Sequence, residues 1–426
     1  MAQRCVCLLA LAATLLLVFP TVSRSMGLKS KEHQRASRIP SQFSKEERVA
    51  MKEALKVFPT VVSTSFIQHE VVEEYSHLFT IQGSDPSLQP YLLMAHFDVV
   101  PAPEEGWEVP PFSALERDGV IYGRGTLDDK NSVMALLQAL ELLLIRKYIP
   151  QRSFFISLGH DEESSGTGAQ KISALLQSRG VQLAFIVDKG GFILDDFIPN
   201  FKKPIALIAV SEKGSMNLML QVNMTSGHSS APPKETSIGI LAAAISRLEQ
   251  TPMPIIFGSG TVVTVLRQVA NEMNVIPPVA QATVNFRIHP EQTVQEVVEL
   301  TKNIVADNRV QFHVLSAFDP LPISPYDDKA LGYQLLRQTV QSVFPEVNIT
   351  VPVTSVGNTD SRFFTNLTTG IYRFYPIYIQ PEDFKRIHGV NEKISVQAYE
   401  TQVKFIFELI QNADTDQEPV SHLHKL

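Results

Sequence analysis

Three apolar runs of strand length constrain the fold of this chain more than any other feature. They cover residues 91–95, 154–158 and 183–187, and a histidine or a carboxylate follows each of them closely. Continuous apolar runs of this length are typical of strands that are buried on both faces of a sheet. Apolar-patterned helices are predicted between them, at residues 131–146 and 167–178. This alternation of strand and helix predicts an open, mostly parallel α/β sheet.

The polar residues that follow the three runs are expected at one edge of this sheet. Ligands bind in open α/β sheets outside the carboxyl ends of the strands. His96 and Asp98 are two residues apart, so both side chains point to the same face of an extended chain. The complete polar set comprises His96, Asp98, Asp128, Asp129, Glu162, Glu163, Asp188 and, in the later segment 387–392, His388. Zinc accepts ligands of this kind, and two zinc ions about 3.5–4 Å apart need a carboxylate to bridge them.

A two-metal hydrolytic site also needs one carboxylate that is not a ligand. Such a group takes a proton from the attacking water and returns it to the leaving nitrogen. The Glu162-Glu163 pair can divide the two tasks, with one side chain directed to metal and the other to substrate. A structural interpretation remains open for each residue, because Asp128 and Asp129 also suit a helix dipole and the Glu pair also suits a solvated turn. Their joint position after the buried runs favours the metal site.

The first 25 residues have the features of a secretory signal peptide. Arg4 precedes an apolar run over residues 5–19, and small residues follow at Ser23 and Ser25. The alternative is a retained signal anchor, but the run is shorter than the about 20 residues of a membrane span. Both cysteines of the chain, Cys5 and Cys7, lie in this segment. A mature protein would therefore hold metal through oxygen and nitrogen only, and would be secreted.

Charge and sequons support an extracellular protein that does not bind nucleic acid. The net charge of -7 provides no basic surface for phosphates. No later stretch has the length of a transmembrane helix, so no membrane span is expected. Glycosylation sequons begin at Asn223, Asn348 and Asn366.

The chain is expected to contain a catalytic domain interrupted by a smaller one. The catalytic parts are residues 26–212 and 318–412, and a polar tail covers 413–426. The inserted segment, 213–317, has a β-α-β-β-α-β order that indicates a ferredoxin-like domain. Its predicted elements are strands at 215–223, 261–270, 279–288 and 310–316 and helices at 234–250 and 293–307. Further helices are predicted at 45–56, 328–343 and 396–411.

The order of motifs along nearly the whole chain resembles the zinc aminoacylase and carboxypeptidase G family of metallopeptidases. The motifs are His96-Phe-Asp98-Val-Val-Pro101, Gly123-Arg-Gly-Thr-Leu-Asp128-Asp-Lys130, Asp161-Glu-Glu163 and Thr359-Asp-Ser-Arg362. The resemblance implies two zinc ions per subunit, with Asp128 shared between them. It implies His96 and Asp188 at one zinc and Glu163 and His388 at the other.

The resemblance also implies roles for residues that do not bind metal. Glu162 would be the general base, and Asp98 would orient a ligand. In the inserted domain, His228 resembles a lid histidine that reaches the active site of a partner subunit, which implies a homodimer through the lid. Asn274 and Arg287 resemble positions that hold the carboxylate of the substrate, with Asp360 and Arg362 in the fourth motif as further substrate-binding residues.

Lys189 departs from the family pattern, which commonly has an acidic residue after the ligand Asp188. If the strand continues through this position, the lysine is expected to point away from the metals. If the chain has already turned, its ammonium approaches them. The chain is also shorter than expected between its first helix and first strand and around residues 271–274.

Three functions remain open at this stage. The first is a secreted amidohydrolase of N-acyl amino acids that cleaves or forms the amide bond, and the resemblance implies a fatty acid as the acyl group. The second is a secreted zinc carboxypeptidase or dipeptidase. The third is a metal-poor binding protein of the same fold, which Lys189 and the short segments favour. The apolar segment 370–378 is interpreted as a core strand in preference to an acyl-chain pocket.

Overall fold

The structure is a computed structural model, and it describes residues 58–196, 203–228, 233–251, 275–276 and 278–414. The predicted signal peptide and the predicted helix at 45–56 lie outside these residues. The chain divides into two compact units. The smaller unit comprises Ser211–Ile323 and Thr354–Asn358, and the remainder forms the larger unit. The segment Thr354–Asn358 also belongs to the smaller unit, although the predicted insertion covered only residues 213–317.

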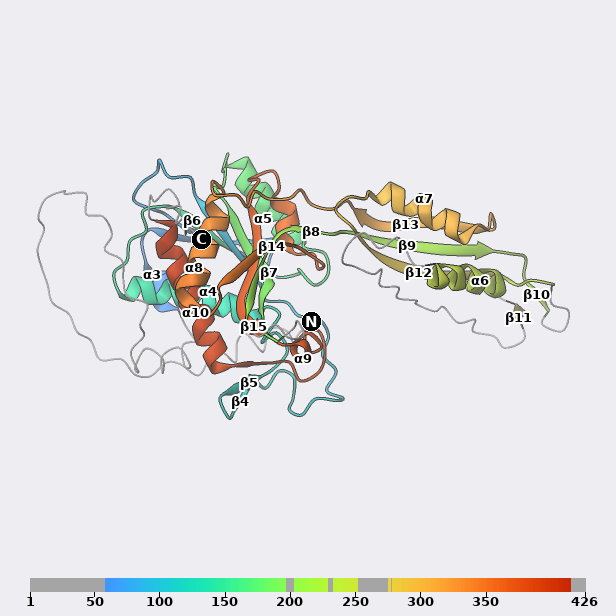
Figure 1. Ribbon diagram of the computed structural model, residues 1–426, viewed down its shortest axis with the longest axis horizontal. Coiled ribbons are helices and arrows are strands. Elements are labelled where there is room, and N and C mark those ends of the chain that lie inside the picture. Colours follow the sequence, from blue (N-terminus) through green and yellow to red (C-terminus); the bar gives the residue numbers. More distant parts are fainter. Residues whose placement is uncertain (1–57, 197–202, 229–232, 252–274, 277, 415–426) are drawn as a thin grey trace, which may run out of the picture. The chain divides into compact units, whose positions relative to one another are not determined.

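An eight-stranded mixed sheet forms the centre of the larger unit (Figure 1). Strands β6, β3, β7 and β15 run parallel to one another, whereas β1, β2 and β8 pair antiparallel. The expected open α/β sheet is thus confirmed, with its parallel strands in the centre. The order across the sheet is β1 (Ile67–Val72), β2 (Ser76–Ile81), β6 (Phe154–Gly159), β3 (Tyr91–His96), β7 (Ile186–Leu194), β15 (Ile371–Ile379), β8 (Ile205–Glu212) and β14 (Ile349–Ser355).

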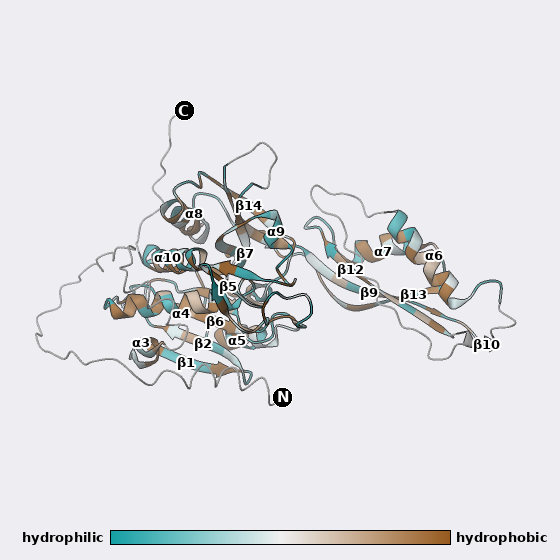
Figure 2. Cartoon of the chain, turned by 90° about the horizontal axis from the view of Figure 1, so that it is seen from below, coloured by the Kyte–Doolittle hydropathy of each residue, from teal (hydrophilic) through white to brown (hydrophobic). Residues whose placement is uncertain are grey.

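Helices cover both faces of this sheet. On one face α4 (Lys130–Ile145), α8 (Leu331–Val343) and α10 (Val396–Ala413) share a large apolar core with the strands. On the other face α5 (Thr167–Ser178) packs with the 3-10 turn η2 (Asp360–Phe364) over a second apolar cluster. Strands buried on both faces explain the continuous apolar runs of the sequence. By contrast, the edge strand β1 carries many hydrophilic residues, drawn teal in Figure 2.

The third predicted run is wrong at its end, because β7 continues through Asp188 instead of ending there. Asp188 is the third residue of this nine-residue strand. Opposite it on β15, Arg373 pairs with Asp188 but the next residue, Phe374, pairs with Gly191. Lys189 and Gly190 are therefore extra residues on β7, and they form a bulge. Gly190 has φ +148°, a conformation that favours glycine.

The apolar segment at 370–378 forms β15, as expected of a core strand. All its residues except Tyr378 are buried. The polar tail, however, begins later than predicted. Helix α10 extends to Ala413, and Asp414 is buried, where it accepts hydrogen bonds from the backbone N–H groups of Gln151 and Arg152.

In the smaller unit, two helices cover one three-stranded antiparallel sheet. The strand order is β12 (Val279–Ile288), β9 (Gly214–Asn223), β13 (Val310–Phe318), and the helices are α6 (Ser237–Gln250) and α7 (Val294–Val305). The hydrophobic residues of α6 and α7, brown in Figure 2, pack on the sheet. A short ladder joins β10 (Gly227–His228) to β11 (Val275–Ile276). The predicted strand at 261–270 lies outside the described residues.

The remaining short elements of the larger unit are α3 (Pro59–Ser63), β4 (Leu115–Arg117), β5 (Val120–Tyr122), α9 (Pro381–Phe384) and β16 (Lys393–Ser395). Within the part of the chain described here, no helix combines the length and the hydrophobicity that crossing a membrane requires.

Helix α4 begins directly after the loop that carries Asp128, so its packing supports the site. Leu143 is fully buried in the large apolar core, whereas Ile145, on the same helix, is 59% exposed. We expect Leu143→Ala to lower the free energy of unfolding by about 2–5 kcal/mol, since it leaves a cavity in the core. The control Ile145→Ala should change it by less than about 0.5 kcal/mol. Urea unfolding of both variants checks this, and equal losses would contradict the core assignment.

Candidate metal centre

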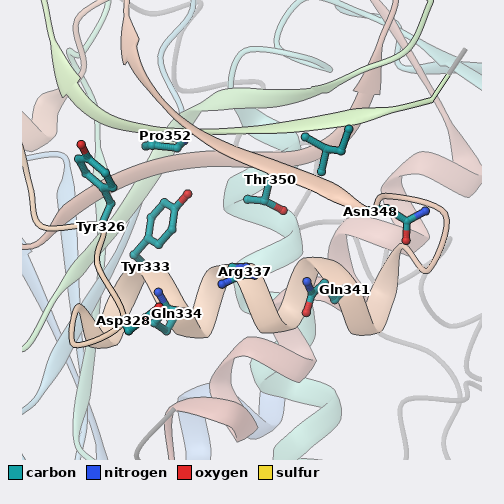
Figure 3. A pocket seen from close by; sticks show the side chains of 10 residues that line it. Tyr326, Asp328, Tyr333, Gln334, Arg337, Gln341, Asn348, Thr350 and Pro352 are labelled. Atoms are coloured by element: carbon teal, nitrogen blue, oxygen red, sulfur yellow. The ribbon is translucent and has the colours of Figure 1, made fainter. Parts of the chain in front are cut away.

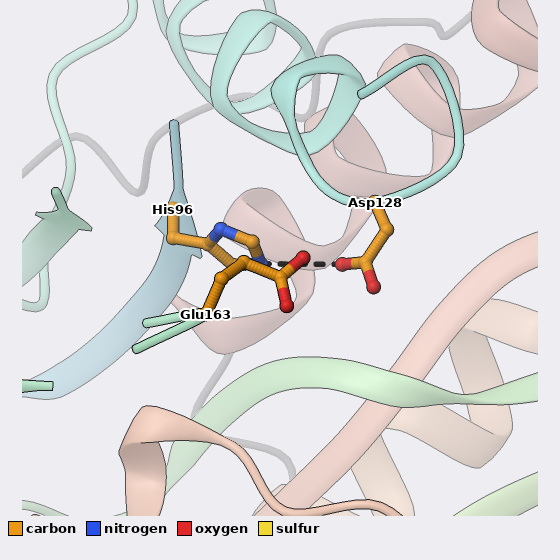
Figure 4. Close-up of side chains that lie close together, drawn as sticks. All are labelled: His96, Asp128 and Glu163. Carbon is orange, nitrogen blue, oxygen red and sulfur yellow. Dashed lines mark hydrogen bonds and ion pairs between the residues drawn. The ribbon is translucent and has the colours of Figure 1, made fainter. Parts of the chain in front are cut away.

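Three side chains from separate segments converge at the carboxyl edge of the large sheet (Figure 4). His96 ends β3, Asp128 lies in the loop before α4, and Glu163 follows β6. One donor atom of each lies within 4.8 Å of the others. The Nε2 atom of His96 is 3.2 Å from Oδ1 of Asp128, and His96 is only 2% exposed. The donor types and their spacing suit a divalent metal with nitrogen and oxygen ligands.

His388, which lies 260 residues after Asp128 in the sequence, also contacts this group. Its Nε2 atom lies 3.1 Å from Oδ2 of Asp128 and 3.0 Å from Oε1 of Glu163. Hydrogen bonds with these two carboxylates raise the pKa of His388 to about 9. Asp128 therefore contacts both histidines, one through each carboxylate oxygen.

Asp98 lies beside the ligand group and connects its parts. Its Oδ1 atom is 3.2 Å from Nδ1 of His96. The two carboxylate oxygens also accept hydrogen bonds from the backbone N–H groups of Glu162 and Glu163, at 3.1 and 3.0 Å. One carboxylate thus fixes the ring orientation of His96 and the position of the Glu-Glu pair, as a second-layer orienting group does.

Glu162 is more buried than Glu163. It is not among the three residues whose donor atoms lie within 4.8 Å of one another. Its side chain is 6% exposed, with Oε2 3.6 Å from Nε2 of His96. Burial raises the pKa of Glu162, although Lys189 and His96 act in the opposite direction. A raised pKa suits a carboxylate that must take up a proton near neutral pH.

Asp188 points its carboxylate at backbone groups. Its Oδ1 accepts from the N–H of Lys189 at 2.8 Å, and its Oδ2 accepts from the N–H of Ser361 at 3.1 Å. Among the described residues, the cluster of possible ligands within 4.8 Å comprises His96, Asp128 and Glu163, without Asp188. Asp188, the expected fifth ligand, therefore lies near the site, but its carboxylate accepts backbone hydrogen bonds.

The Lys189 side chain approaches the ligand group, although β7 continues through this residue. Its Nζ lies 2.5 Å from Oδ1 of Asp128 and 3.4 Å from Oε1 of Glu162. The expectation that a continuing strand turns the lysine away is wrong, because the bulge at Lys189–Gly190 breaks the alternation of side chains. Burial would raise the pKa of Asp128, but the Lys189 ammonium and both histidines hold it well below its usual range.

The predicted substrate-binding residues occupy different places. Asp360 is buried against Gly159 and Gly166, and burial raises its pKa to about 8. Arg362 donates to the carbonyl of Thr359 and lies over the ring of Phe363. In the smaller unit, Arg287 donates to the side-chain oxygen of Asn358 at 2.6 Å. The backbone of His228 pairs with Val275, and Asn274 lies outside the described residues.

Three buried residues support the ligands; sequence reasoning placed Asp129 in the polar set without a role of its own, and it did not single out Arg124 or Glu392. Asp129 is fully buried, and its Oδ2 accepts the backbone N–H of His96 at 3.1 Å. Arg124 and Glu392 form a buried ion pair beside Asp128 and His388. All three lie within the segments noted in the sequence, directly beside a predicted ligand or a few residues from it. Their burial was the missing signal, since a charged residue in a loop is normally solvated.

A separate cavity of about 400 Å³ lies between α8 and β14 of the larger unit (Figure 3). Tyr326, Tyr333 and Arg337 line it, together with Asn348 and Thr350 of the second sequon. None of the predicted metal ligands lines this cavity. The first residues of all three sequons, Asn223, Asn348 and Asn366, are exposed.

Comparison with known proteins identifies the family. The profile of Peptidase family M20/M25/M40 matches residues 92–412. The chain is 81% identical to the human N-fatty-acyl-amino acid synthase/hydrolase PM20D1 over 502 aligned positions, which cover all of both chains. This chain has 426 residues, so the human protein carries segments without a counterpart here.

More distant relatives agree with this result. The chain is 33% identical to the probable carboxypeptidase S-like 2 of Dictyostelium discoideum, over 86% of this chain and 80% of that one. The fold is similar to that of the M20 family metallo-carboxypeptidase Sso-CP2 of Sulfolobus solfataricus, with a TM-score of 0.63 at 16% identity over 87% of this chain and 94% of that one. The chain therefore belongs to peptidase family M20/M25/M40, a family of metallopeptidases.

Proposed function

We propose that this chain is a secreted, zinc-dependent amidohydrolase of N-acyl amino acids. It hydrolyses the amide bond between a fatty acid and an amino acid, and it forms the same bond in reverse. The convergence of His96, Asp128 and Glu163 at one sheet edge carries the proposal, because these donors suit a hydrolytic metal. The similarity to the human N-fatty-acyl-amino acid synthase/hydrolase supports the choice of substrate.

Two zinc ions per subunit complete the proposed site. The two sets of residues are His96, Asp128 and Asp188 for one ion and Asp128, Glu163 and His388 for the other. The contacts of Asp128 with both histidines support its role as the shared ligand. When bound, the metals would lower the pKa of the attacking water and polarise the scissile carbonyl. The residues fit this role once the Lys189 ammonium leaves Asp128.

Glu162 is the proposed general base. It receives the proton of the attacking water and delivers it to the leaving nitrogen. Burial favours the protonated form of its carboxyl group and so favours uptake of that proton. Asp98 keeps Glu162 in place through the backbone N–H group of that residue.

The resemblance to the family assigns substrate recognition to a further group of residues. Arg287 and Asn274 hold the amino-acid carboxylate, because an arginine fork matches a planar carboxylate. Asp360 and Arg362 complete the binding residues, and His228 from a partner subunit polarises the scissile carbonyl in a homodimer joined through the smaller unit. Glycans at Asn223, Asn348 and Asn366 fit the exposed positions of these asparagines and the proposed secretion.

A carboxypeptidase or dipeptidase is the second candidate, favoured by the similarity to the Dictyostelium and Sulfolobus carboxypeptidases. Side-by-side assays with an N-acyl-phenylalanine and with a dipeptide separate the two functions. Preference for the N-acyl-phenylalanine is the expected result, and preference for the dipeptide would favour the second candidate. The third candidate, a metal-poor binding protein, is favoured by the Lys189 contact with Asp128.

Glu162→Gln tests the proposed base. We expect at least about 100-fold lower turnover of an N-acyl-phenylalanine, because proton transfer is lost while the shape of the side chain is kept. Zinc content and the unfolding midpoint should match those of the parent protein. A variant that retains normal turnover with normal zinc content would exclude Glu162 as the base.

Lys189→Glu tests the competition between the ammonium and metal. We expect higher zinc occupancy, because the substitution removes a cation beside Asp128 and adds a carboxylate. Lys189→Met separates the loss of the ammonium from the gain of a carboxylate. Lys171→Glu, at an exposed position of α5, controls for net charge alone. Metal analysis of protein from one expression host gives the answer, and equal occupancy in all four proteins would show that Lys189 does not oppose metal.

His228→Ala tests the homodimer. We expect a loss of activity on the order of 100-fold without loss of zinc, as for removal of one group that stabilises the oxyanion. Mixing this variant with Glu162→Gln should restore part of the activity, because a mixed dimer can assemble one intact site. If subunits exchange and no activity returns, each chain works alone.

A further inference from the structure

A buried ion pair joins the two segments that carry Asp128 and His388. The Nη1 atom of Arg124 lies 2.6 Å from Oε2 of Glu392, and the two side chains are 3% and 0% exposed. Arg124 belongs to the loop before α4, and Glu392 belongs to the turn that follows α9. The segments are more than 260 residues apart in the sequence.

The second oxygen of Glu392 holds the backbone of the Asp128 loop. Oε1 accepts hydrogen bonds from the N–H groups of Gly125, Leu127 and Asp128, at 3.1, 2.6 and 3.1 Å. Three convergent N–H donors are a strong site for one carboxylate. Glu392, which belongs to the segment of His388, therefore fixes the direction in which the Asp128 side chain points.

The second terminal nitrogen of Arg124 holds the backbone of the His388 turn. Nη2 donates to the carbonyl oxygens of His388 and Gly389, at 3.2 and 2.8 Å. His388 has φ +61° in this turn, a left-handed conformation that is costly for a residue with a side chain. Hydrogen bonds to its carbonyl and the next one stabilise the conformation that directs the ring at Asp128 and Glu163.

Stability alone does not account for this arrangement. A buried ion pair often contributes no more than apolar residues of the same volume, because both charges lose their hydration. Here each partner bonds the backbone of the other partner's segment. Because of this ion pair, the backbone geometry of each ligand segment depends on the position of the other segment.

We propose that Arg124 and Glu392 act as a clamp, a pair of positioning residues that align Asp128 and His388 with one another for metal binding. The proposal deepens the proposed function, because it concerns the same metal centre. The clamp makes two ligand loops that are distant in sequence into one preformed site.

The only tryptophan of the chain provides a built-in probe of the clamp. Trp107 lies with its ring 5.3 Å from the guanidinium carbon of Arg124. A change in the position of Arg124 is expected to change the fluorescence of Trp107. No label is needed.

The test uses Glu392→Gln and Arg124→Lys in the full chain, with Glu141→Gln as the matched control. Glu141 is also a buried carboxylate that accepts two backbone N–H groups, those of Thr60 and Val61, but it lies in α4 away from the ligand loops. Zinc affinity, Trp107 emission and hydrogen exchange are measured for each protein after chelation and titration with Zn²⁺.

We expect zinc affinity to fall about 10- to 100-fold in both clamp variants, as for other residues that orient metal ligands, and to be unchanged in Glu141→Gln. Exchange should quicken on both sides of the pair in each clamp variant, in residues 125–128 and in residues 386–392, because each side chain holds the segment of the other. Trp107 emission should shift in both clamp variants and not in the control. Parental zinc affinity in a folded clamp variant, or faster exchange on one side only, would overturn the proposal.

The two proposals fail in different ways. If Glu392→Gln does not fold, Arg124→Lys tests the clamp by the same criteria. This substitution keeps the positive charge and removes only the forked guanidinium group. If the parent chain binds no zinc, the metal assignment of the proposed function is wrong. Exchange across the pair and Trp107 emission in the metal-free proteins then still confirm or overturn the clamp.

Discussion

The concentration of carboxylates at one edge of the sheet is the constraint on which the rest of the structure depends. Asp128, Glu162 and Glu163 surround His96 in a largely buried space. Two like charges 4 Å apart repel by about 4 kcal/mol at an effective dielectric constant of 20, so the cluster needs cations. Lys189 and the two histidines supply positive charge in the structure. We propose that divalent metals take over this task and that Lys189 competes with them.

The parallel centre of the sheet brings these groups together. Strands β3 and β6 run in register, so His96 lies opposite Gly159, and the Glu162-Glu163 pair follows within a few residues. Three acidic side chains then fix each position: Asp98 connects His96 with the Glu pair, Asp129 holds the backbone of His96, and Glu392 holds the loop of Asp128. The ligands are thus supported mainly through backbone hydrogen bonds, which keep the loops in place even before a metal binds.

The pattern of apolar residues was sufficient to predict strands and helices such as β3, β6, α5 and β12. Local exceptions to that pattern could not be predicted. The bulge at Lys189–Gly190 depends on how β15 pairs with β7, and pairing between distant strands leaves no periodic signal in either one. Most proposed ligands were predictable because histidine and carboxylates after buried strands are unusual. Arg124 and Glu392 were not, since their importance lies in burial and backbone contacts. The buried Asp414 was missed for the same reason.

We infer that the carboxylate cluster binds metal for amide hydrolysis. The most direct measurement is hydrolysis of an N-acyl-phenylalanine by the purified chain as isolated, after chelation and after return of Zn²⁺, with bound zinc measured on the same samples. The account predicts that activity disappears with the metal and returns in proportion to the zinc that rebinds. Undiminished hydrolysis by the metal-free protein, or rebound zinc without any return of activity, would contradict it.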